Sequence, residues 1–427
     1  MAENRELTAA LARLDALTNW ERRPRGAMRV GLQSMLDLAA RLGDPQKSFR
    51  SVHVAGTKGK GSVSALIEAA LAHGGLRVGR YASPHVEHVT ERVSLQGCDI
   101  DALTLARALD TSLDAYEAAR NAKTEGANAT WFDVMTCAAF VVFREQGVEW
   151  AVVEVGLGGR LDSTNIVNGE IAIVTNIELE HTEILGETRA AIAREKVGIL
   201  KPGAILITTL APEDEAGKVL QARADELHSR VVRASLGDQA TIEETNVAIS
   251  SAALDELGRL GVVTGAGRKV GAALIDARTR AAARLIGRME RRNAAVGSSR
   301  VAVVFDGAHV PFNLAAVLRD LARMPDLAGP CIAVVALAAD KDAAGFLSEL
   351  AGRASAIVLT DLPSASRGRS AAELQAIAAS LGLTSEVVRD AKLAFQRAVE
   401  LAAHANAWLL VTGSLYLVGE LRGEAES

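Results

Sequence analysis

A glycine-rich segment, Gly56–Ser62 (GTKGKGS), follows a short apolar run, Ser51–Ala55. Beyond it, apolar residues recur at spacings of three and four from Val63 to Leu71, which predicts a helix with one buried face. Backbone N–H groups between a strand and a helix N-terminus can bind a triphosphate. We therefore expect the phosphates to be bound by Gly59, Lys60, Gly61 and Ser62. The strict Walker spacing is not met, so the plainer alternative is a glycine-rich turn with a surface lysine.

Three further residues have side chains that suit metal or phosphoryl chemistry. Glu154 lies near the end of the apolar run Trp150–Val155, and a carboxylate at the carboxyl end of a buried strand beside a phosphate loop is well placed to hold Mg²⁺. His181 comes after the next apolar run, Ile171–Thr175, and so can reach the same sheet edge. A single histidine is more often structural, and imidazole is not a preferred Mg²⁺ donor. Lys196 alone would be interpreted as helix surface, so the three matter only together.

The composition gives no electrostatic case for a nucleic-acid or membrane-surface partner, because the net charge of the 427 residues is −5. The N-terminal segment is charged and amphipathic, and no stretch reaches the ~18 apolar residues of a membrane span. Cys98, Cys137 and Cys331 form no CxxC pair, so we expect buried, reduced thiols. These features predict a cytoplasmic protein, and no amphipathic surface suggests a partner chain, so a monomer is expected.

Apolar runs alternate with amphipathic stretches, which predicts an α/β fold, and the length predicts two domains. We expect a phosphate-loop domain over residues 1–292, with a helix-rich stretch at 211–260, and a smaller Rossmann-like domain over residues 299–427. The polar segment Arg291–Arg300 is interpreted as the linker. The strand candidates of the second domain are Val301–Phe305, Cys331–Leu337, Ala356–Thr360 and Trp408–Thr412.

Short motifs spread over most of the chain carry a resemblance to a known family. They are GTKGKGS (56–62), YASPHVEHVTERV (81–93), TWFDVMT (130–136), EVGLGGRLDSTNIV (154–167), HTEILG (181–186), EKVGILK (195–201), IGR (286–288), DGAH (306–309), DKD (340–342) and VTGSLYLVGE (411–420). With these motifs in this order, the chain resembles the folylpolyglutamate synthase/dihydrofolate synthase family, a branch of the Mur ligase superfamily. The glycine-rich 156–165 segment followed by the histidine and lysine is very specific to that family.

The resemblance implies a P-loop, Mur-ligase-like central domain, a C-terminal Rossmann-like glutamate ligase domain, and roles for matched residues. Besides the glycine-rich loop, the nucleotide would be bound by Asn246, Arg288 and Asp306. Mg²⁺, as one or two ions, would be held by Ser83, Glu154, His181 and Lys196. The pterin-bearing substrate would be contacted by Ser83, Thr130, Phe132, Asp133, Leu161, Asp162 and Ser163. Catalytic roles are implied for Lys60, Lys196 and His309.

The implied activity is an ATP-dependent ligation of L-glutamate to a folate or dihydropteroate carboxylate through an acyl phosphate, releasing ADP and phosphate. Lys196 resembles the lysine that the superfamily carries as a carbamate. Burial near bound cations lowers the pKa of a lysine, which must lose a proton to react with CO₂. The product is an oxygen anion that can ligate a hard cation. A need for K⁺ is left open.

Departures from the family pattern keep other functions open. Val310 stands where the family has asparagine, and the segment before Asn246 is short and lacks a His-Gln pair. One alternative is another Mur-superfamily ligase with a different acceptor, although the SPH…TERV and TWFD segments favour the folate branch. Another is a non-catalytic nucleotide-binding paralogue, although such a protein has no reason to keep the four residues Lys60, Glu154, His181 and Lys196. For His309, capping the loop after its strand is as plausible as contact with the phosphoryl group.

Overall fold

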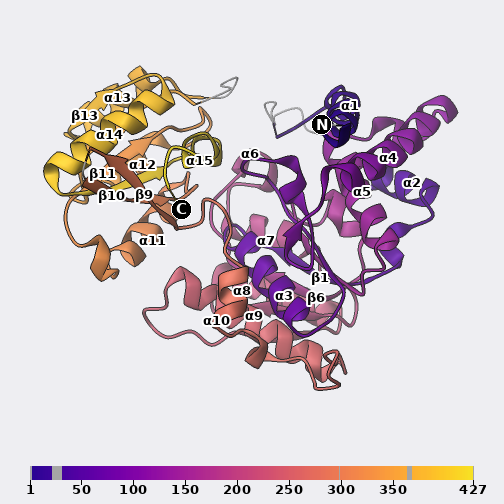
Figure 1. Ribbon diagram of the computed structural model, residues 1–427. Helices are drawn as coiled ribbons and strands as arrows, with labels where there is room; N and C mark the ends of the chain where they lie inside the picture. The colour runs from indigo at the N-terminus through magenta and orange to yellow at the C-terminus, as the bar shows by residue number, and fades with distance from the viewer. Residues whose placement is uncertain (1, 22–30, 298, 363–367, 427) are drawn as a thin grey trace. The chain divides into compact units, whose positions relative to one another are not determined.

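The computed structural model describes residues 2–21, 31–297, 299–362 and 368–426. It divides into two compact units, Met1–Ala283 and Arg284–Ser427, each built around its own sheet (Figure 1). Both units alternate strands with helices, which confirms the predicted α/β class. Within the described ranges, no helix combines the length and the apolar character that crossing a bilayer requires.

The sheet of the first unit has eight strands over the described residues, in the order β4-β3-β2-β5-β1-β6-β7-β8. The run from β2 to β8 in this order is parallel, and β3 and β4 add an antiparallel edge. The strands are β1 (Arg50–Ala55), β2 (Val78–Tyr81), β3 (Val93–Leu95), β4 (Cys98–Asp99), β5 (Trp150–Glu154), β6 (Gly169–Val174), β7 (Ile205–Thr208) and β8 (Arg230–Arg233).

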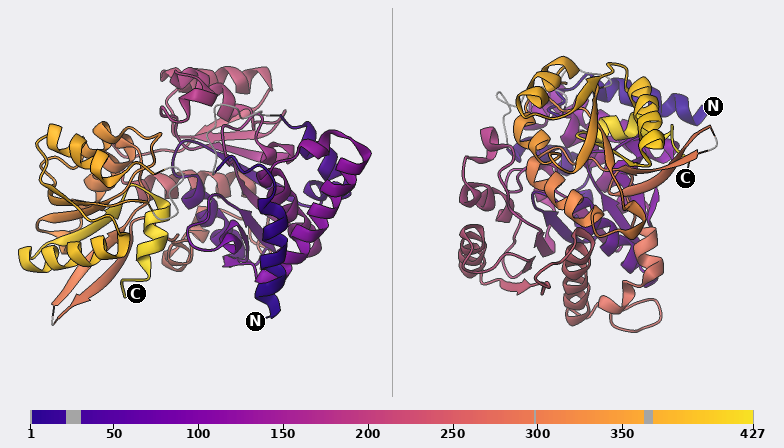
Figure 2. Two further views of the ribbon diagram at one scale, coloured as in Figure 1. Left: turned by 90° about the horizontal axis from the view of Figure 1, so that it is seen from above. Right: turned by 90° about the vertical axis from the view of Figure 1, so that its left-hand side faces the viewer.

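Helices cover both faces of this sheet (Figures 1 and 2). They are α1 (Ala2–Asp15), α2 (Gln33–Arg41), α3 (Lys60–His73), α4 (Ala102–Ala122), α5 (Trp131–Glu145), α6 (Thr182–Leu185), α7 (Arg189–Val197), α8 (Glu215–Glu226), α9 (Ile242–Arg259) and α10 (Ala277–Ala282). Helix α3 packs on β1, β2 and β5, with α9 and α10 against it. Other buried clusters join α1, α2, α4 and α5 to one part of the sheet and α7 and α8 to another. This double cover explains why the parallel strands are continuously apolar.

The strand register brings several strand ends to one edge of the first sheet. In β1, Val54 pairs with Glu154 of β5, and Ala55 pairs with Val174 of β6. On the far side of β5, β2 ends at Tyr81, also in register. The chain leaves β1 toward β2 on one side and later passes from β5 to β6 on the other, so the winding reverses at β1. In open parallel sheets, ligands bind at the carboxyl ends of the strands beside such a reversal.

The sheet of the second unit has six strands over the described residues, in the order β13-β12-β11-β14-β10-β9, with β9 antiparallel to β10 and the rest parallel. The strands are β9 (Glu290–Val296), β10 (Ser299–Phe305), β11 (Cys331–Val335), β12 (Ala354–Leu359), β13 (Ser385–Val387) and β14 (Trp408–Thr412). The helices are α11 (Pro311–Leu321), α12 (Ala343–Ser348), α13 (Ala371–Ser380), α14 (Ala391–Ala405) and α15 (Leu415–Arg422). Helix α14 contacts β9 to β12 and β14, as a crossover packed on the sheet does.

The segment predicted to link the domains is instead part of the second unit. Residues 290–296 form β9, which pairs residue by residue with β10, and the division between the units falls after Ala283. The prediction of a linker at Arg291–Arg300 is therefore wrong over its described residues. An edge strand can carry polar side chains on its exposed positions, and its burial pattern alternates in this way. Such a strand has the composition of a linker.

Smaller expectations also need correction. The thiol of Cys98 is exposed, whereas Cys137 and Cys331 are buried as expected, and all three are free. Cys98 lies on β4, a two-residue strand at the sheet edge in which both residues are exposed. The stretch predicted to be helix-rich at 211–260 also contains the strand β8. In the second unit, β9 and β13 add to the strands that were foreseen.

Candidate active site

The glycine-rich segment Gly56–Ser62 runs from the end of β1 into the first turn of α3, and hydrogen bonds connect it to the residues that follow β6. Lys58 N donates to Asn176 Oδ1 at 2.8 Å, and Thr175 Oγ1 donates to the Lys58 carbonyl at 2.6 Å. Gly56 has a φ of 144°, and a Cβ there would lie 1.8 Å from Thr175 Oγ1, so no larger residue fits. The loop is thereby held in one shape at the carboxyl edge of the sheet, with the N-terminus of α3 behind it.

Two lysines far apart in the sequence meet at this loop. Lys60 Nζ and Lys196 Nζ both donate to the Gly56 carbonyl oxygen, at 3.1 and 3.0 Å. Lys196 lies on α7 and is only 6% exposed, so it is not a helix-surface residue. Its pKa falls from 10.5 to about 7, because burial penalises the charged form and Lys60 repels it. A neutral amine, which carbamylation requires, is therefore accessible near neutral pH.

His181 is connected to the phosphate loop through Glu180. Glu180 Oε1 accepts a hydrogen bond from Lys58 Nζ at 2.9 Å and lies 3.9 Å from His181 Nε2. The side chains of Lys58, Glu180 and His181 are 19%, 10% and 18% exposed, so their charges interact with little screening by water. The structure thus brings His181 beside the loop, as its position after β6 led us to expect.

Glu154 and Ser83 lie at the ends of neighbouring strands on the same sheet edge. Glu154 is the last residue of β5 and is 5% exposed, and Ser83 follows β2 by two residues. Their role as Mg²⁺ ligands stays a prediction. Among the described residues, no group of three or more His, Cys, Asp or Glu side chains could hold a metal ion on its own. A Mg²⁺ ion here would need oxygens from the serine, a carbamate or the phosphates as well.

The glycine-rich turn after β5 packs directly on the backbone that carries Lys196. A Cβ on Gly159 would lie 2.7 Å from the Glu195 carbonyl oxygen and 2.8 Å from that of Lys196. Arg160 N donates to the Glu195 carbonyl at 2.7 Å, and the Arg160 and Glu195 side chains form an ion pair at 2.8 Å. The turn of residues 156–166, which carries the predicted substrate residues Leu161, Asp162 and Ser163, therefore lies beside the lysine that the phosphate loop contacts.

Asp162 organises this 156–166 turn. Its carboxylate accepts hydrogen bonds from Leu157 N at 2.8 Å, Thr164 N at 3.0 Å and Thr164 Oγ1 at 2.5 Å. Burial raises the pKa of Asp162, while these hydrogen bonds oppose the rise. The contacts in the structure are thus within the turn itself. A contact of Asp162, or of the neighbouring Leu161, with a pterin stays a prediction.

The other predicted substrate residues gather around the same turn. Thr130 and Asp133 form a capping box at the start of α5, in which Thr130 N donates to Asp133 Oδ2 at 2.7 Å. Ser163 Oγ donates to Asp133 Oδ1 at 2.6 Å and so joins the turn to this helix. The ring of Phe132 would lie 2.6 Å from a Cβ on Gly156. The structure thus clusters these side chains, and their contact with substrate stays a prediction.

Asn246 lies on α9 and is 7% exposed. Its Oδ1 would lie 2.8 Å from a Cβ on Gly59, so the amide rests against the phosphate loop. This position agrees with a place in the nucleotide site. Recognition of the rest of the nucleotide by Asn246 stays a prediction.

Three predicted site residues belong to one short region of the second unit: Arg288, Asp306 and His309. Asp306 accepts hydrogen bonds from the backbone N–H groups of Ala308 at 2.8 Å and Met289 at 2.9 Å. His309 Nδ1 bonds to the Gly307 carbonyl at 2.8 Å, which is the loop-capping contact that was weighed against catalysis. The nucleotide and catalytic roles of these three residues stay predictions.

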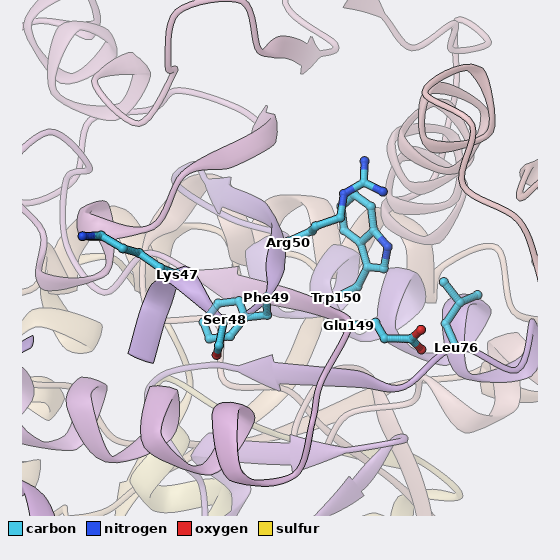
Figure 3. A pocket seen from close by; sticks show the side chains of 7 residues that line it. All are labelled: Lys47, Ser48, Phe49, Arg50, Leu76, Glu149 and Trp150. Atoms are coloured by element: carbon cyan, nitrogen blue, oxygen red, sulfur yellow. The ribbon is translucent and has the colours of Figure 1, made fainter. Parts of the chain in front are cut away.

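A cavity of about 430 Å³ lies elsewhere on the first unit (Figure 3). Its lining consists of Lys47, Ser48, Phe49, Arg50, Leu76, Glu149 and Trp150. Arg50 begins β1 and Trp150 begins β5, so the cavity lies at the amino ends of these strands, opposite the phosphate loop. The Arg50 guanidinium stacks 4.2 Å from the centre of the Trp150 ring and pairs with Glu170 at 2.6 Å. Since parallel sheets bind ligands at the carboxyl edge, we place the active site there and not in this cavity.

Comparison with known proteins agrees with this arrangement. Residues 54–257 match the Mur ligase middle domain, and residues 287–415 match the Mur ligase glutamate ligase domain. The dihydrofolate synthase/folylpolyglutamate synthase of Escherichia coli K12 is 34% identical over 340 residues, which cover 75% of each chain. This chain belongs to the dihydrofolate synthase/folylpolyglutamate synthase family. The predicted family and the predicted Mur-ligase-like fold are both confirmed.

Solved structures of family members extend over nearly the whole chain. Escherichia coli FolC in complex with DHPP and ADP has a TM-score of 0.80 and 28% identity, and the match covers 98% of this chain and 97% of that one. A bifunctional folylpolyglutamate synthase/dihydrofolate synthase with Mn, AMPPNP and L-glutamate bound has a TM-score of 0.78 and 27% identity, and the match covers 98% of this chain and 97% of that one. In sequence, however, the chain spans less than half the length of several curated relatives that it matches. The matched share is 46% of the Bacillus subtilis dihydrofolate synthase/folylpolyglutamate synthase, and 27% and 49% of the probable bifunctional folylpolyglutamate synthase/dihydropteroate synthases of Haloferax volcanii and Halobacterium salinarum.

Sequence reasoning missed residues that hold the site together without belonging to a familiar motif. Thr175 and Asn176 shape the phosphate loop, Lys58 and Glu180 connect it to His181, and Asn165 Nδ2 donates to the Arg160 carbonyl at 2.8 Å. A signal for Thr175 and Asn176 was present, because polar residues directly after a buried strand next to β1 must lie at the same edge. No comparable local signal exists for the pairing of Lys58 with Glu180.

Proposed function

We propose that this protein is an ATP-dependent ligase that joins L-glutamate to a folate-type carboxylate, with dihydropteroate or a reduced folate as acceptor. The observation that carries the proposal is the convergence of Lys60 and Lys196 on the Gly56 carbonyl oxygen. It places a phosphate-loop lysine and an amine of low pKa together, beside the turn packed on Lys196. Family structures holding DHPP and ADP, or AMPPNP and L-glutamate, support this choice of substrates.

The residues at this edge fit a magnesium triphosphate. The loop offers backbone N–H groups and a helix N-terminus, and its Gly56 could not carry a side chain. In our proposal Ser83, Glu154, His181 and the carbamate of Lys196 would hold Mg²⁺, which when bound neutralises charge on the phosphate oxygens. The carbamate would form when the neutral Lys196 amine bonds to the carbon of CO₂ and releases a proton to solvent.

The reaction that we propose needs position and charge more than a protein nucleophile. Lys60 stabilises the β- and γ-phosphates while a carboxylate oxygen of the acceptor attacks the γ-phosphorus and ADP departs. The α-amine of glutamate then attacks the acyl carbon, loses a proton, and displaces inorganic phosphate as the amide forms. The 156–166 turn and the start of α5 would hold the acceptor carboxylate in line, which is the main contribution of positioning residues. We further propose that the protein works as a cytoplasmic monomer.

The test measures ADP and phosphate release from MgATP and glutamate in three separate reactions. One contains dihydropteroate, one contains tetrahydrofolate, and one contains no acceptor. We expect release to depend on a pterin and to yield the glutamylated product by mass spectrometry. Release stimulated by another carboxylate, but by neither pterin, would favour a different Mur-type ligase. ATP binding without release under any condition would favour a non-catalytic paralogue. The residue that motivates this alternative is Val310, which lies at the N-terminus of α11 and whose side chain forms no capping hydrogen bond.

A further inference from the structure

His53 is a buried histidine that the reaction outlined above leaves without a role. It lies on β1, two residues before the strand ends, and its side chain is fully buried. Burial and the charge of Lys201 lower its pKa to about 3, so the imidazole is neutral at physiological pH. Its Nδ1 has no hydrogen-bond partner within the described residues. A buried polar atom without a partner destabilises the folded protein, so a leucine of similar size would suit the core better than a histidine.

The other ring nitrogen of His53 begins a chain of hydrogen bonds into the 156–166 turn. Nε2 lies 2.9 Å from Thr164 Oγ1, and Thr164 Oγ1 in turn donates to Asp162 Oδ1 at 2.5 Å. A hydroxyl has one proton, and here it goes to the carboxylate, so the threonine oxygen must accept from His53. These directions put the imidazole proton on Nε2 and the lone pair on the unpartnered Nδ1. The far oxygen of Asp162 accepts from Leu157 N at 2.8 Å.

We propose that His53 is a positioning residue for acceptor binding: its Nε2–H orients the Thr164 hydroxyl, which orients the Asp162 carboxylate and thereby the 156–166 turn. The inference rests on the proposed function, because it assigns the pterin-bearing acceptor to this turn. His53 is three residues before Gly56, so the same strand, β1, leads into the phosphate loop and carries the histidine that holds the acceptor turn in position. A residue with this task should affect use of the acceptor more than use of ATP.

The kinetic test compares KM for dihydropteroate and KM for ATP in two pairs of variants. His53→Leu removes the donor and Thr164→Val removes the hydroxyl, whereas His53→Gln keeps an N–H near the Nε2 position and Thr164→Ser keeps the hydroxyl. We expect each of the first two variants to raise the KM for dihydropteroate about tenfold, the effect of losing one buried hydrogen bond. The KM for ATP should stay within about twofold, and the two conservative variants should recover most of the loss.

Two comparisons separate positioning from a general loss of stability. Val52→Ala also removes buried volume from β1, but the valine side chain takes no part in the hydrogen-bond chain from His53 through Thr164. The KM values of this variant for dihydropteroate and for ATP should therefore match those of the parent. The double variant His53→Leu/Thr164→Val should be no worse than either single variant, because both break one chain. Equal changes in both KM values, or a His53→Leu enzyme like the parent, would overturn the inference.

A spectroscopic measurement tests the hydrogen-bond chain without using turnover. In protein labelled with ¹⁵N-histidine, one of the eight histidines should be missing from the His53→Gln spectrum, which assigns His53. Its shifts should report protonated Nε2 and unprotonated Nδ1, and Thr164→Val should change the Nε2 signal. The opposite tautomer would refute the chain. If no pterin stimulates the parent enzyme, the proposed function fails before any variant is compared, and this spectrum alone decides whether the chain exists.

Discussion

At the scale of single residues, the side chain whose chemistry the fold changes most within the site is that of Lys196. On an exposed helix face it would be a charged ammonium, but here it is buried and shares an acceptor with Lys60. Desolvation and the neighbouring positive charge both favour the neutral amine. A phosphate loop that already holds two lysines, Lys58 and Lys60, thus favours a third lysine that is uncharged and reactive.

Replacing Lys196 by alanine should abolish turnover while leaving the fold intact. The proposed carbamate would be lost, and with it the charge it adds beside the triphosphate, so kcat should fall about a thousandfold or more. Steady-state ADP release and circular dichroism would measure the two effects. Arg194→Ala, on the exposed face of the same helix, is the matched control and should behave as the parent. Activity of Lys196→Ala within tenfold of the parent would contradict the role.

The low pKa of His53 predicts a pH dependence of stability. Between its folded pKa of about 3 and its ordinary value of 6.5, the unfolded chain binds a proton that the folded protein does not. Stability therefore rises with pH through this window, by up to about 1.4 kcal/mol per pH unit from this group. The His53→Gln variant lacks this titrating imidazole, so its free energy of unfolding in urea should fall less steeply from pH 6 to pH 4. Parallel curves for the two proteins would argue against a buried neutral His53.

At the scale of elements, the site depends on the close contact between the 156–166 turn and the end of α7. Only a glycine lets the turn lie against the carbonyls of Glu195 and Lys196, because a Cβ on Gly159 would come within 2.7 and 2.8 Å of them. The contact fixes the distance between the proposed acceptor site and Lys196. The phosphate loop is held in a comparable way, through Thr175 and Asn176 after β6.

The Gly159→Ala substitution should push the turn away from α7. Since misplacing substrate by about 1 Å can lower a rate about a hundredfold, we expect kcat/KM for the pterin to fall by about that factor. Stability should drop by about 1–3 kcal/mol, as is typical of an overpacked contact. Gly237→Ala, where a Cβ would meet nothing within 4 Å, is the matched control and should be neutral. An unchanged kcat/KM in Gly159→Ala would show that this contact does not determine the position of the acceptor relative to Lys196.

At the scale of the whole molecule, each of the two units has its own sheet and its own helices packed on that sheet. In the first, the predicted phosphate and acceptor residues lie along one sheet edge; in the second, Arg288, Asp306 and His309 lie within one region. A unit with its own core can unfold as a cooperative block.

Calorimetry should therefore resolve two thermal transitions. Saturating MgATP should raise the transition of the first unit by about 5 °C, since ligand at about a hundred times Kd adds about 2.7 kcal/mol. Val52→Ala, in the core of the first sheet, identifies that transition by lowering it. Lys60→Met should remove most of the shift produced by MgATP. A single transition in the ligand-free protein would contradict the division into separately cooperative units.

Much of the architecture follows from local sequence patterns. The run at Trp408–Thr412 is the strand β14 as predicted, and the predicted helix after β1 is α3. The expectation of a single buried face is wrong, because every residue from Val63 to Leu71 is buried and the helix is therefore covered on all sides. Such elements are determined by periodicity over a few residues, which a single sequence displays directly. The prediction of a linker at Arg291–Arg300 was wrong because this segment is polar and has no apolar run. Only its pairing with β10 identifies residues 290–296 as an edge strand.

The sequence by itself determined which residues could do the chemistry and which strands and helices would carry them. Only the tertiary structure decided that Lys196 and Lys60, more than a hundred positions apart, share the Gly56 carbonyl, that Asp162 bonds within its own turn, and that His53 is neutral with a single bonded nitrogen. Protonation states and hydrogen-bond partners depend on burial and on long-range contacts. These arise only when distant segments pack together, so no local stretch of sequence contains them.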